Sequence, residues 1–126
     1  MSDISTFEDL DVWKLGCQLA VDVCAATSGA KDYALKDQMQ RAAISIPSNI
    51  AEGCERDSTP DFIKFLRYSK GSCGELRTQL YIAERVRQKL AQPSIEGSRE
   101  MITETRKISK MLQALITSLK RRLNDS

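Results

Sequence analysis

Histidine is absent from the 126-residue sequence, and its absence excludes several classes of enzyme. A serine–histidine or cysteine–histidine nucleophile pair cannot be built without an imidazole base. A di-iron centre of the Glu-x-x-His kind, which other helical bundles carry, is excluded for the same reason. These exclusions favour a protein that is not an enzyme.

Proline and glycine are also scarce, with three and six residues respectively, whereas an all-β fold with many turns would need more of both. No apolar run approaches the roughly 20 residues that a membrane-spanning helix requires. Residues 1–8 are too polar and acidic for a secretory signal peptide. With 41% hydrophobic and 29% charged residues, the sequence is typical of one globular domain over residues 1–126, which we expect in the cytoplasm and not in a membrane.

Four cysteines are present, and none of their spacings is that of a zinc-binding pair. Cys17 and Cys24 lie on the same face of one predicted helix, whereas Cys54 and Cys73 belong to two others. We favour reduced thiols packed in the core, because a free cysteine behaves as a small hydrophobic residue. A disulfide and a four-thiolate metal site are the alternatives, and no cofactor is expected.

Apolar residues at helical spacing predict four helices, which makes the fold all-α. The third helix has the clearest start, because Ser58 or Thr59 can cap it and Pro60 suits a first turn. Short connections favour an antiparallel up-down-up-down four-helix bundle. The predicted helices cover residues 9–27, 34 to between 53 and 57, 60–89, and 93 or 94 to 123.

Pro47 lies inside the second predicted helix, where proline removes a backbone hydrogen bond at a cost of roughly 3 kcal/mol. We therefore predict that this helix is kinked at Pro47. Ser45, Ser48 and Asn49 flank the proline. Short polar side chains of this kind can bond the backbone groups that proline leaves free.

Gly71 and Gly74 lie inside the third predicted helix, although glycine there costs about 1 kcal/mol relative to alanine. Near one face of the helix, they would allow the helix that contains Pro47 to come unusually close. We favour this packing role. The alternative is that a ligand or the backbone of a partner approaches the two glycines.

Four charged residues predict a polar network between the second and third helices. Glu52 and Arg56 are in the favourable order for a helical ion pair. Together with Arg41 and Glu75 they would form a buried network that fixes the helix register. The alternative is a small pocket in which the carboxylates of Glu52 and Glu75 perform acid–base chemistry. The complete set comprises Arg41, Ser45, Pro47, Ser48, Asn49, Glu52, Arg56, Gly71, Ser72 and Glu75.

Charge is distributed unevenly, although the net charge is only +2. Residues 1–55 hold four basic and nine acidic residues, a net −5, whereas residues 56–126 hold fifteen basic and eight acidic residues, a net +7. Basic stripes on the last two helices would follow a phosphate backbone with little readout of bases. The alternative is a solvated face whose cations pair with acidic residues of a neighbouring protomer. The candidate nucleic-acid-binding residues are Arg67, Lys70, Arg77, Arg85, Arg99, Arg106, Lys107, Lys110, Lys120, Arg121 and Arg122.

Several motifs stand out in combination along almost the whole chain. They are Phe7-Glu8-Asp9-Leu10, Val12-Trp13, Gln38 with Arg41-Ala42, Ser45 to Gly53, Arg56, Gly71-Ser72 with Glu75-Leu76, and Met111-Leu112 with Leu115-Ile116. In this combination the sequence resembles the bacterial four-helix-bundle family of 23S rRNA intervening-sequence proteins, which includes the accessory variability proteins of diversity-generating retroelements. The resemblance implies a four-helix protomer that assembles into a ring, typically a pentamer. For the retroelement branch it also implies binding to nucleic acid and to a reverse transcriptase through basic surfaces.

Three hypotheses follow for the function. The first, which we favour, is a non-enzymatic, ring-forming protein that binds RNA, DNA or a nucleic-acid enzyme through its last two helices. The second is a ring-forming scaffold whose partner is another protein. The third is a hydrolytic or small-molecule activity near Glu52 and Glu75. We expect a homo-oligomer, because long helices with wide apolar faces leave surface that one protomer does not cover.

Overall fold

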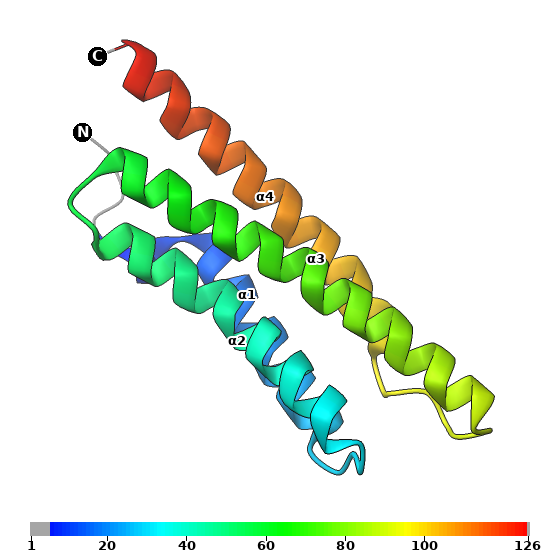
Figure 1. Cartoon of the computed structure of the whole chain (residues 1–126). Coiled ribbons are helices and arrows are strands. Elements are labelled where there is room, and N and C mark those ends of the chain that lie inside the picture. Colours follow the sequence, from blue (N-terminus) through cyan, green and yellow to red (C-terminus); the bar gives the residue numbers. More distant parts are fainter. Residues whose placement is uncertain (1–5, 126) are drawn as a thin grey trace.

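The computed structural model describes residues 6–125, which form four α-helices, one short 3₁₀ helix and no strand. Consecutive helices run in opposite directions along the bundle (Figure 1). The second helix packs on the first and third, and the fourth packs on the third and more loosely on the first. The predicted all-α four-helix fold is confirmed. The elements are η1 (Phe7–Asp9), α1 (Asp11–Thr27), α2 (Tyr33–Glu55), α3 (Thr59–Lys89) and α4 (Ser98–Asp125).

Alternating spacings of four and three residues place one face of α3 in the core, as in a coiled-coil seam. Burying one leucine or isoleucine side chain contributes about 1.5–3 kcal/mol relative to leaving it exposed. This burial free energy holds the apolar stripe of α3 against the neighbouring helices. It also explains why the spacing of apolar residues predicted where the helices lie. The buried residues of α3 at this spacing are Phe62, Leu66, Ser69, Cys73, Leu76, Leu80 and Ala83.

The starts of α1 and α3 depend on local backbone geometry. α1 begins at Asp11 rather than at Asp9, because Leu10 is extended, with φ −79° and ψ 122°, and separates the helix from the 3₁₀ turn before it. The predicted cap of α3 is confirmed, since the Ser58 side chain accepts a hydrogen bond from the Asp61 N–H at 3.3 Å.

The start of α4 was predicted wrongly, because this helix begins at Ser98 and not at Pro93–Ser94. The segment before it turns, with Gly97 at φ 75°. Ile95 enters the core at 5% exposure, and its N–H donates to Glu84 Oε1 at 3.0 Å. Burying Ile95 and pairing its amide require an irregular segment where the sequence pattern predicted helix.

α2 stays helical through Pro47, and the kink remains a prediction. Asn49 Nδ2 donates to the Ser45 carbonyl at 2.8 Å, so a side chain next to the proline does bond the backbone. A further bond comes from another helix, because Ser69 Oγ on α3 donates to the Ile46 carbonyl at 2.8 Å. Neither acceptor is the carbonyl of Ala43, which is the group that Pro47 leaves without its helical N–H partner. The two bonds therefore hold the backbone beside the proline without replacing the lost bond.

The close helix approach predicted at Gly71 and Gly74 is wrong. A Cβ added at either residue would meet no atom within 4 Å beyond the helix's own backbone. The close approaches lie at other glycines. An added Cβ would lie 2.7 Å from Phe65 Cβ at Gly53 and 3.3 Å from a side chain of α2 at Gly16. Glycines therefore do allow close packing on both sides of α2. They are Gly16 of α1 and Gly53 of α2, not the two glycines of α3.

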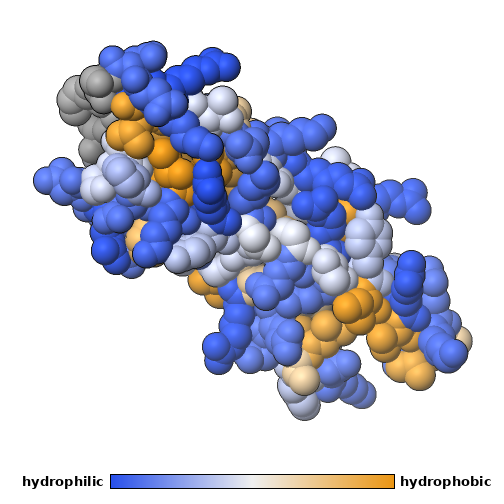
Figure 2. All heavy atoms as spheres, turned by 45° about the horizontal axis from the view of Figure 1, so that its top comes forward, coloured by the Kyte–Doolittle hydropathy of each residue, from blue (hydrophilic) through white to orange (hydrophobic). Residues whose placement is uncertain are grey.

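The surface is mainly polar. Figure 2 shows a largely hydrophilic face with hydrophobic side chains near the two ends of the bundle. Leu90 at the end of α3 and Leu123 near the end of α4 are 59% and 42% exposed. Within residues 6–125, none of the helices combines the length and apolar character needed to cross a membrane.

Alanine substitution at the two kinds of glycine should have opposite effects. Gly53→Ala should lower the free energy of unfolding by on the order of 1–3 kcal/mol, because the new Cβ collides with Phe65. Gly71→Ala should raise it by about 0.5–1 kcal/mol, since alanine favours the helix and finds open space. Urea unfolding followed by circular dichroism measures both changes. Equal effects of the two substitutions would contradict the packing described for Gly53.

Candidate nucleic-acid interface

Polar side chains cross between α3 and α4 where the two helices lie side by side. Lys70 Nζ on α3 donates to Gln113 Oε1 on α4 at 2.7 Å. Three turns farther along α3, the Tyr81 hydroxyl accepts from Arg106 Nη2 of α4 at 2.8 Å. The two bonds identify the flank of each helix that faces the other.

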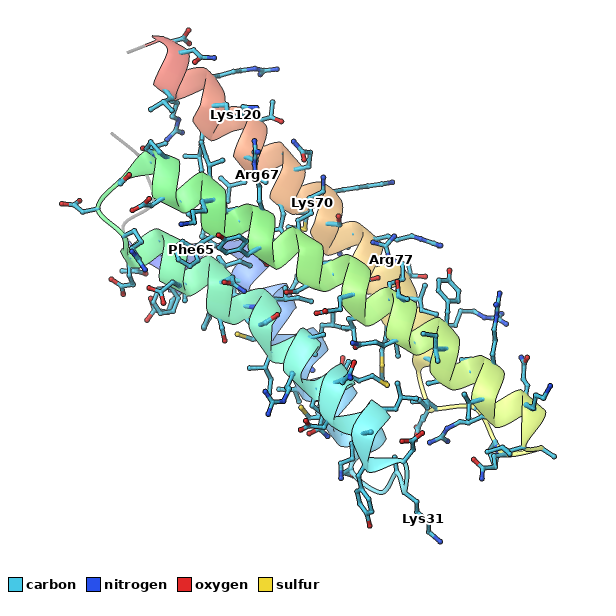
Figure 3. The ribbon with its side chains drawn as sticks, viewed as in Figure 1. Lys31, Phe65, Arg67, Lys70, Arg77 and Lys120 are labelled. Atoms are coloured by element: carbon cyan, nitrogen blue, oxygen red, sulfur yellow. The ribbon has the colours of Figure 1, made fainter. Side chains whose placement is uncertain are left out.

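Cations gather on these two flanks, in a line that we call the cationic seam. In Figure 3, Arg67, Lys70 and Arg77 follow one another along α3, and Lys120 lies beside them on α4. Arg106 and Lys110 are one turn apart on α4, on the flank that bonds to α3. The acidic residues Glu84 and Glu100 line a hollow at the loop end of this flank. The cationic seam comprises Arg67, Lys70, Arg77, Arg106, Lys110 and Lys120.

Arg77 is the seam residue whose hydrogen bonding is incomplete. Its Nε is shielded from solvent and has no hydrogen-bond partner within residues 6–125. A buried donor without an acceptor costs about 1–3 kcal/mol, and more when the group is charged. If the side chain turned toward solvent, an anionic oxygen could reach this nitrogen and remove that cost.

Five of the predicted cations lie outside the seam. Lys107 Nζ lies 3.9 Å from Glu104 Oε1, and Glu104 faces the groove between α4 and α1. Arg99 lines the hollow at the loop end of α4. All five are exposed, so the structure brings six of the eleven predicted residues together and leaves the others dispersed. The dispersed residues are Arg85, Arg99, Lys107, Arg121 and Arg122.

The buried ionic network predicted between α2 and α3 is wrong. Arg41 pairs with Asp37 of its own helix at 3.0 Å, and the two side chains are 80% and 65% exposed. Arg56 pairs with Glu52 at 3.3 Å, also at the surface. An acidic partner four residues away on the same helix is nearer than any on another helix, and exposed pairs of this kind contribute at most about 1 kcal/mol.

Hydroxyl groups take the place of the ionic network between α2 and α3. Ser45 Oγ on α2 donates to Ser72 Oγ on α3. Ser48 and Gly71, which were predicted to belong to the same network, are exposed. The two serines are 27 positions apart in the chain, and the packing of α2 against α3 brings them together.

The pair of carboxylates proposed for acid–base chemistry does not form a shared site. Glu75 lines an open hollow of about 330 Å³ with Arg41, Ser45 and other residues of α2 and α3. Glu52 is not among the residues that line this hollow. The hypothesis of a two-carboxylate pocket is therefore wrong.

An aromatic cluster on α3 was missed in the sequence. The rings of Phe65 and Tyr68 meet edge to face, with centroids 5.4 Å apart. The Arg56 guanidinium lies 4.9 Å from the Phe65 ring, and Lys64 Nζ lies 5.9 Å from each ring. Two aromatic residues three positions apart on a helix, with basic residues nearby, are the signal that could have revealed this cluster.

The four cysteines are free thiols, and only Cys73 is fully buried. Burial raises the pKa of the Cys73 thiol to about 12, although the nearby Arg77 guanidinium lowers it. Burial also raises the pKa of Cys17, and it raises that of Cys54 together with the charges of Glu55 and Glu8. Residues 6–125 contain no cluster of three or more side chains able to hold a metal ion.

Comparison with known proteins identifies the family. The family model of the 23S rRNA-intervening sequence protein matches residues 8–114. The chain belongs to this family. Among solved structures, it is similar to a protein of unknown function from the S23 ribosomal protein family of Bacteroides thetaiotaomicron, with 22% identity and a TM-score of 0.74 over 83% of this chain and 97% of the other. At this identity the similarity supports the family's fold alone, and the chain has no match among curated proteins.

Thiol labelling should separate Cys73 from the other cysteines. At pH 8, Ellman's reagent should react with Cys73 on the order of a hundredfold more slowly than with the three half-buried thiols, because only the exposed thiolate reacts. Mass spectrometry of the labelled peptides measures the rates. Uniform rates would contradict the burial of Cys73.

The same thiol makes stability depend on pH in the alkaline range. The folded state holds the Cys73 proton more tightly than the unfolded chain, whose thiol titrates near 9.0. The free energy of unfolding should therefore fall as the pH rises above 9, and Cys73→Ala should lose this contribution. Chemical denaturation at pH 8 and pH 10 measures the difference.

Proposed function

We propose that the protein is a non-enzymatic, oligomeric member of its family that binds nucleic acid through the cationic seam. The observation that carries the proposal is the convergence of cations from two helices on one line, with an unsatisfied guanidinium nitrogen at Arg77. Phosphate oxygens suit both features, because they are anionic and accept several hydrogen bonds.

The geometry of the seam favours contacts with the backbone of the nucleic acid. Arg106 and Lys110 are separated by about 6 Å along the axis of α4, and cations at such intervals follow phosphates rather than base edges. Tyr81 is 42% exposed beside Arg106, and its ring offers a surface on which an unpaired base can stack. A single strand therefore gains a contact at Tyr81 that a duplex does not.

The proposed assembly is a ring, with the pentamer that the family resemblance implies. Partly exposed apolar side chains on α2 and α3 support contacts between protomers. A ring repeats the seam and multiplies the number of phosphates that one particle contacts. A reverse transcriptase or another nucleic-acid enzyme is a candidate partner, as in the retroelement branch. The apolar side chains are Ile44, Tyr68, Ile82 and Val86.

The same apolar side chains favour a second candidate function, a ring-forming scaffold for another protein that binds no nucleic acid. Tyr68 and Ile44 are both 49% exposed, and Tyr68 belongs to the aromatic cluster. Exposed aromatic side chains are enriched at protein interfaces.

A titration at several salt concentrations tests the function of the seam. Nuclease-treated protein should bind RNA, duplex DNA or an RNA–DNA hybrid, with affinity that falls steeply with salt. If one protomer neutralises about three phosphates, the logarithmic slope should be near −3. Arg106→Glu combined with Lys110→Glu should weaken binding at least about tenfold.

The matched control combines Lys14→Glu with Lys31→Glu, two reversals on exposed residues away from the seam. Figure 3 shows Lys31 at the far end of the α1–α2 hairpin. This variant has the same net charge as the seam variant, and its binding should change much less. Equal losses in both variants, or no binding at low salt, would favour the protein scaffold.

Light scattering tests the oligomer independently. The mass in solution should be a multiple of the 14.1 kDa of one chain, with a fivefold mass for the proposed ring. Replacing Ile44 and Tyr68 by serine should lower the mass if α2 and α3 form the contact. A monomer at micromolar concentration would contradict the assembly.

A further inference from the structure

A second surface lies on the other side of α4, in a groove between α1 and α4 of about 470 Å³. Its floor is apolar. Leu19 and Met101 lie there, 2% and 6% exposed, beside the half-buried Leu15. Ala25, Ala26 and Gly97 also line it, and these small residues leave room for an incoming helix. The groove follows from the loose packing of α1 on α4.

The rim of this groove is acidic. Asp22 of α1 faces Glu96, Glu100 and Glu104 of the opposite wall, and no lysine or arginine lines the groove. The side chains of Glu96 and Glu100 make no ion pair or hydrogen bond within the described part of the chain. Because α4 carries the cationic seam on its α3 side, its two flanks have opposite charge.

Glu104 provides a separate sign that a donor is missing. Its Oε1 is shielded from solvent and has no hydrogen-bond partner among the described residues. Lys107 Nζ is the cation paired with it, at 3.9 Å, which is too long for a hydrogen bond. A carboxylate oxygen withdrawn from water in this way costs free energy until a donor reaches it.

We propose that the α1–α4 groove binds an amphipathic helix with lysine or arginine on one side, supplied by a partner protein of different sequence. The apolar side of that helix would cover Leu15, Leu19 and Met101, and its cations would pair with Asp22, Glu100 and Glu104. The charge of the groove selects this partner, since an acidic helix would add negative charge beside four carboxylates, and among the described residues only Glu104 has a cation paired with it, Lys107. The proposal goes beyond nucleic-acid binding and uses the opposite flank of α4.

A model peptide tests the groove directly. The probe is a 14-residue helical peptide of leucine and lysine, and its control is the same peptide with glutamate in place of lysine. The lysine peptide should shift the NMR signal of the Met101 methyl group, which lies in the groove. The signal of Met39, which lines a different hollow and does not line the groove, should stay unchanged.

Variants then assign the binding to the acidic rim. Glu100→Gln combined with Glu104→Gln should weaken the peptide about tenfold by calorimetry, with the melting temperature and the nucleic-acid affinity unchanged. Asp57→Asn combined with Glu75→Gln removes two exposed acidic residues elsewhere and should leave the affinity for the peptide unchanged.

Three results would overturn the proposal. The first is an unshifted Met101 signal, and the second is an equal loss of affinity in both double variants. The third is a lower oligomeric mass for the rim variant alone, which would assign the groove to a second copy of this chain. Nucleic-acid affinity is measured on the same variants, so a failure of the seam and a failure of the groove remain distinguishable.

Discussion

The packing of α2 between α1 and α3 is the constraint on which the rest of the bundle depends. Pro47 removes a backbone donor from the middle of α2, yet Ile46 and Ile50 beside it are fully buried. Both neighbouring helices fit this defect. A Cβ added at Gly16 would lie 3.5 Å from the proline ring, and Ser69 donates to the carbonyl before it. A Cβ at position 16 would also lie 3.3 Å from Ile46 Cγ2, so the two helices could keep this spacing only if that side chain shifted.

The position of the cationic seam follows from that core. Ser69 belongs to the buried stripe of α3 and is bonded to α2, so the rotation of α3 about its own axis is fixed. On a helix with a fixed core stripe, residues one position along point to a neighbouring flank. Lys70, next to Ser69, therefore faces α4 and bonds to Gln113. The choice of buried residues on α3 thus sets the position of the seam. No further interaction is needed to align the cations of α3 along it.

Sequence periodicity predicted the helices well and the polar contacts poorly, for a physical reason. Burial of residues such as Leu66 and Leu76 depends on an apolar stripe, which the sequence displays directly. The contact of Ser45 with Ser72 depends on the rotation and register of two helices, which no local pattern contains. The predicted ionic network between α2 and α3 was wrong because Arg41 and Arg56 each pair with an acidic residue one turn away on their own helix. The close approach predicted at Gly71 and Gly74 was wrong because a glycine permits close packing only where another helix lies against it. The close contact between α2 and α3 lies at Gly53 of α2 instead.

The opposite charges of the two flanks of α4 restrict what each can bind. A helix with its side chains is about 10–12 Å wide, and electrostatic interactions in physiological salt decay over about 8 Å. The seam and the groove are therefore largely screened from each other, and neither cancels the charge of the other. The carboxylates of Glu100 and Glu104 oppose any path that would carry a phosphate backbone from the seam around α4 to α1. If the seam binds nucleic acid as proposed, the strand would be confined to the α3 side, and the α1 side would stay accessible while the seam is occupied.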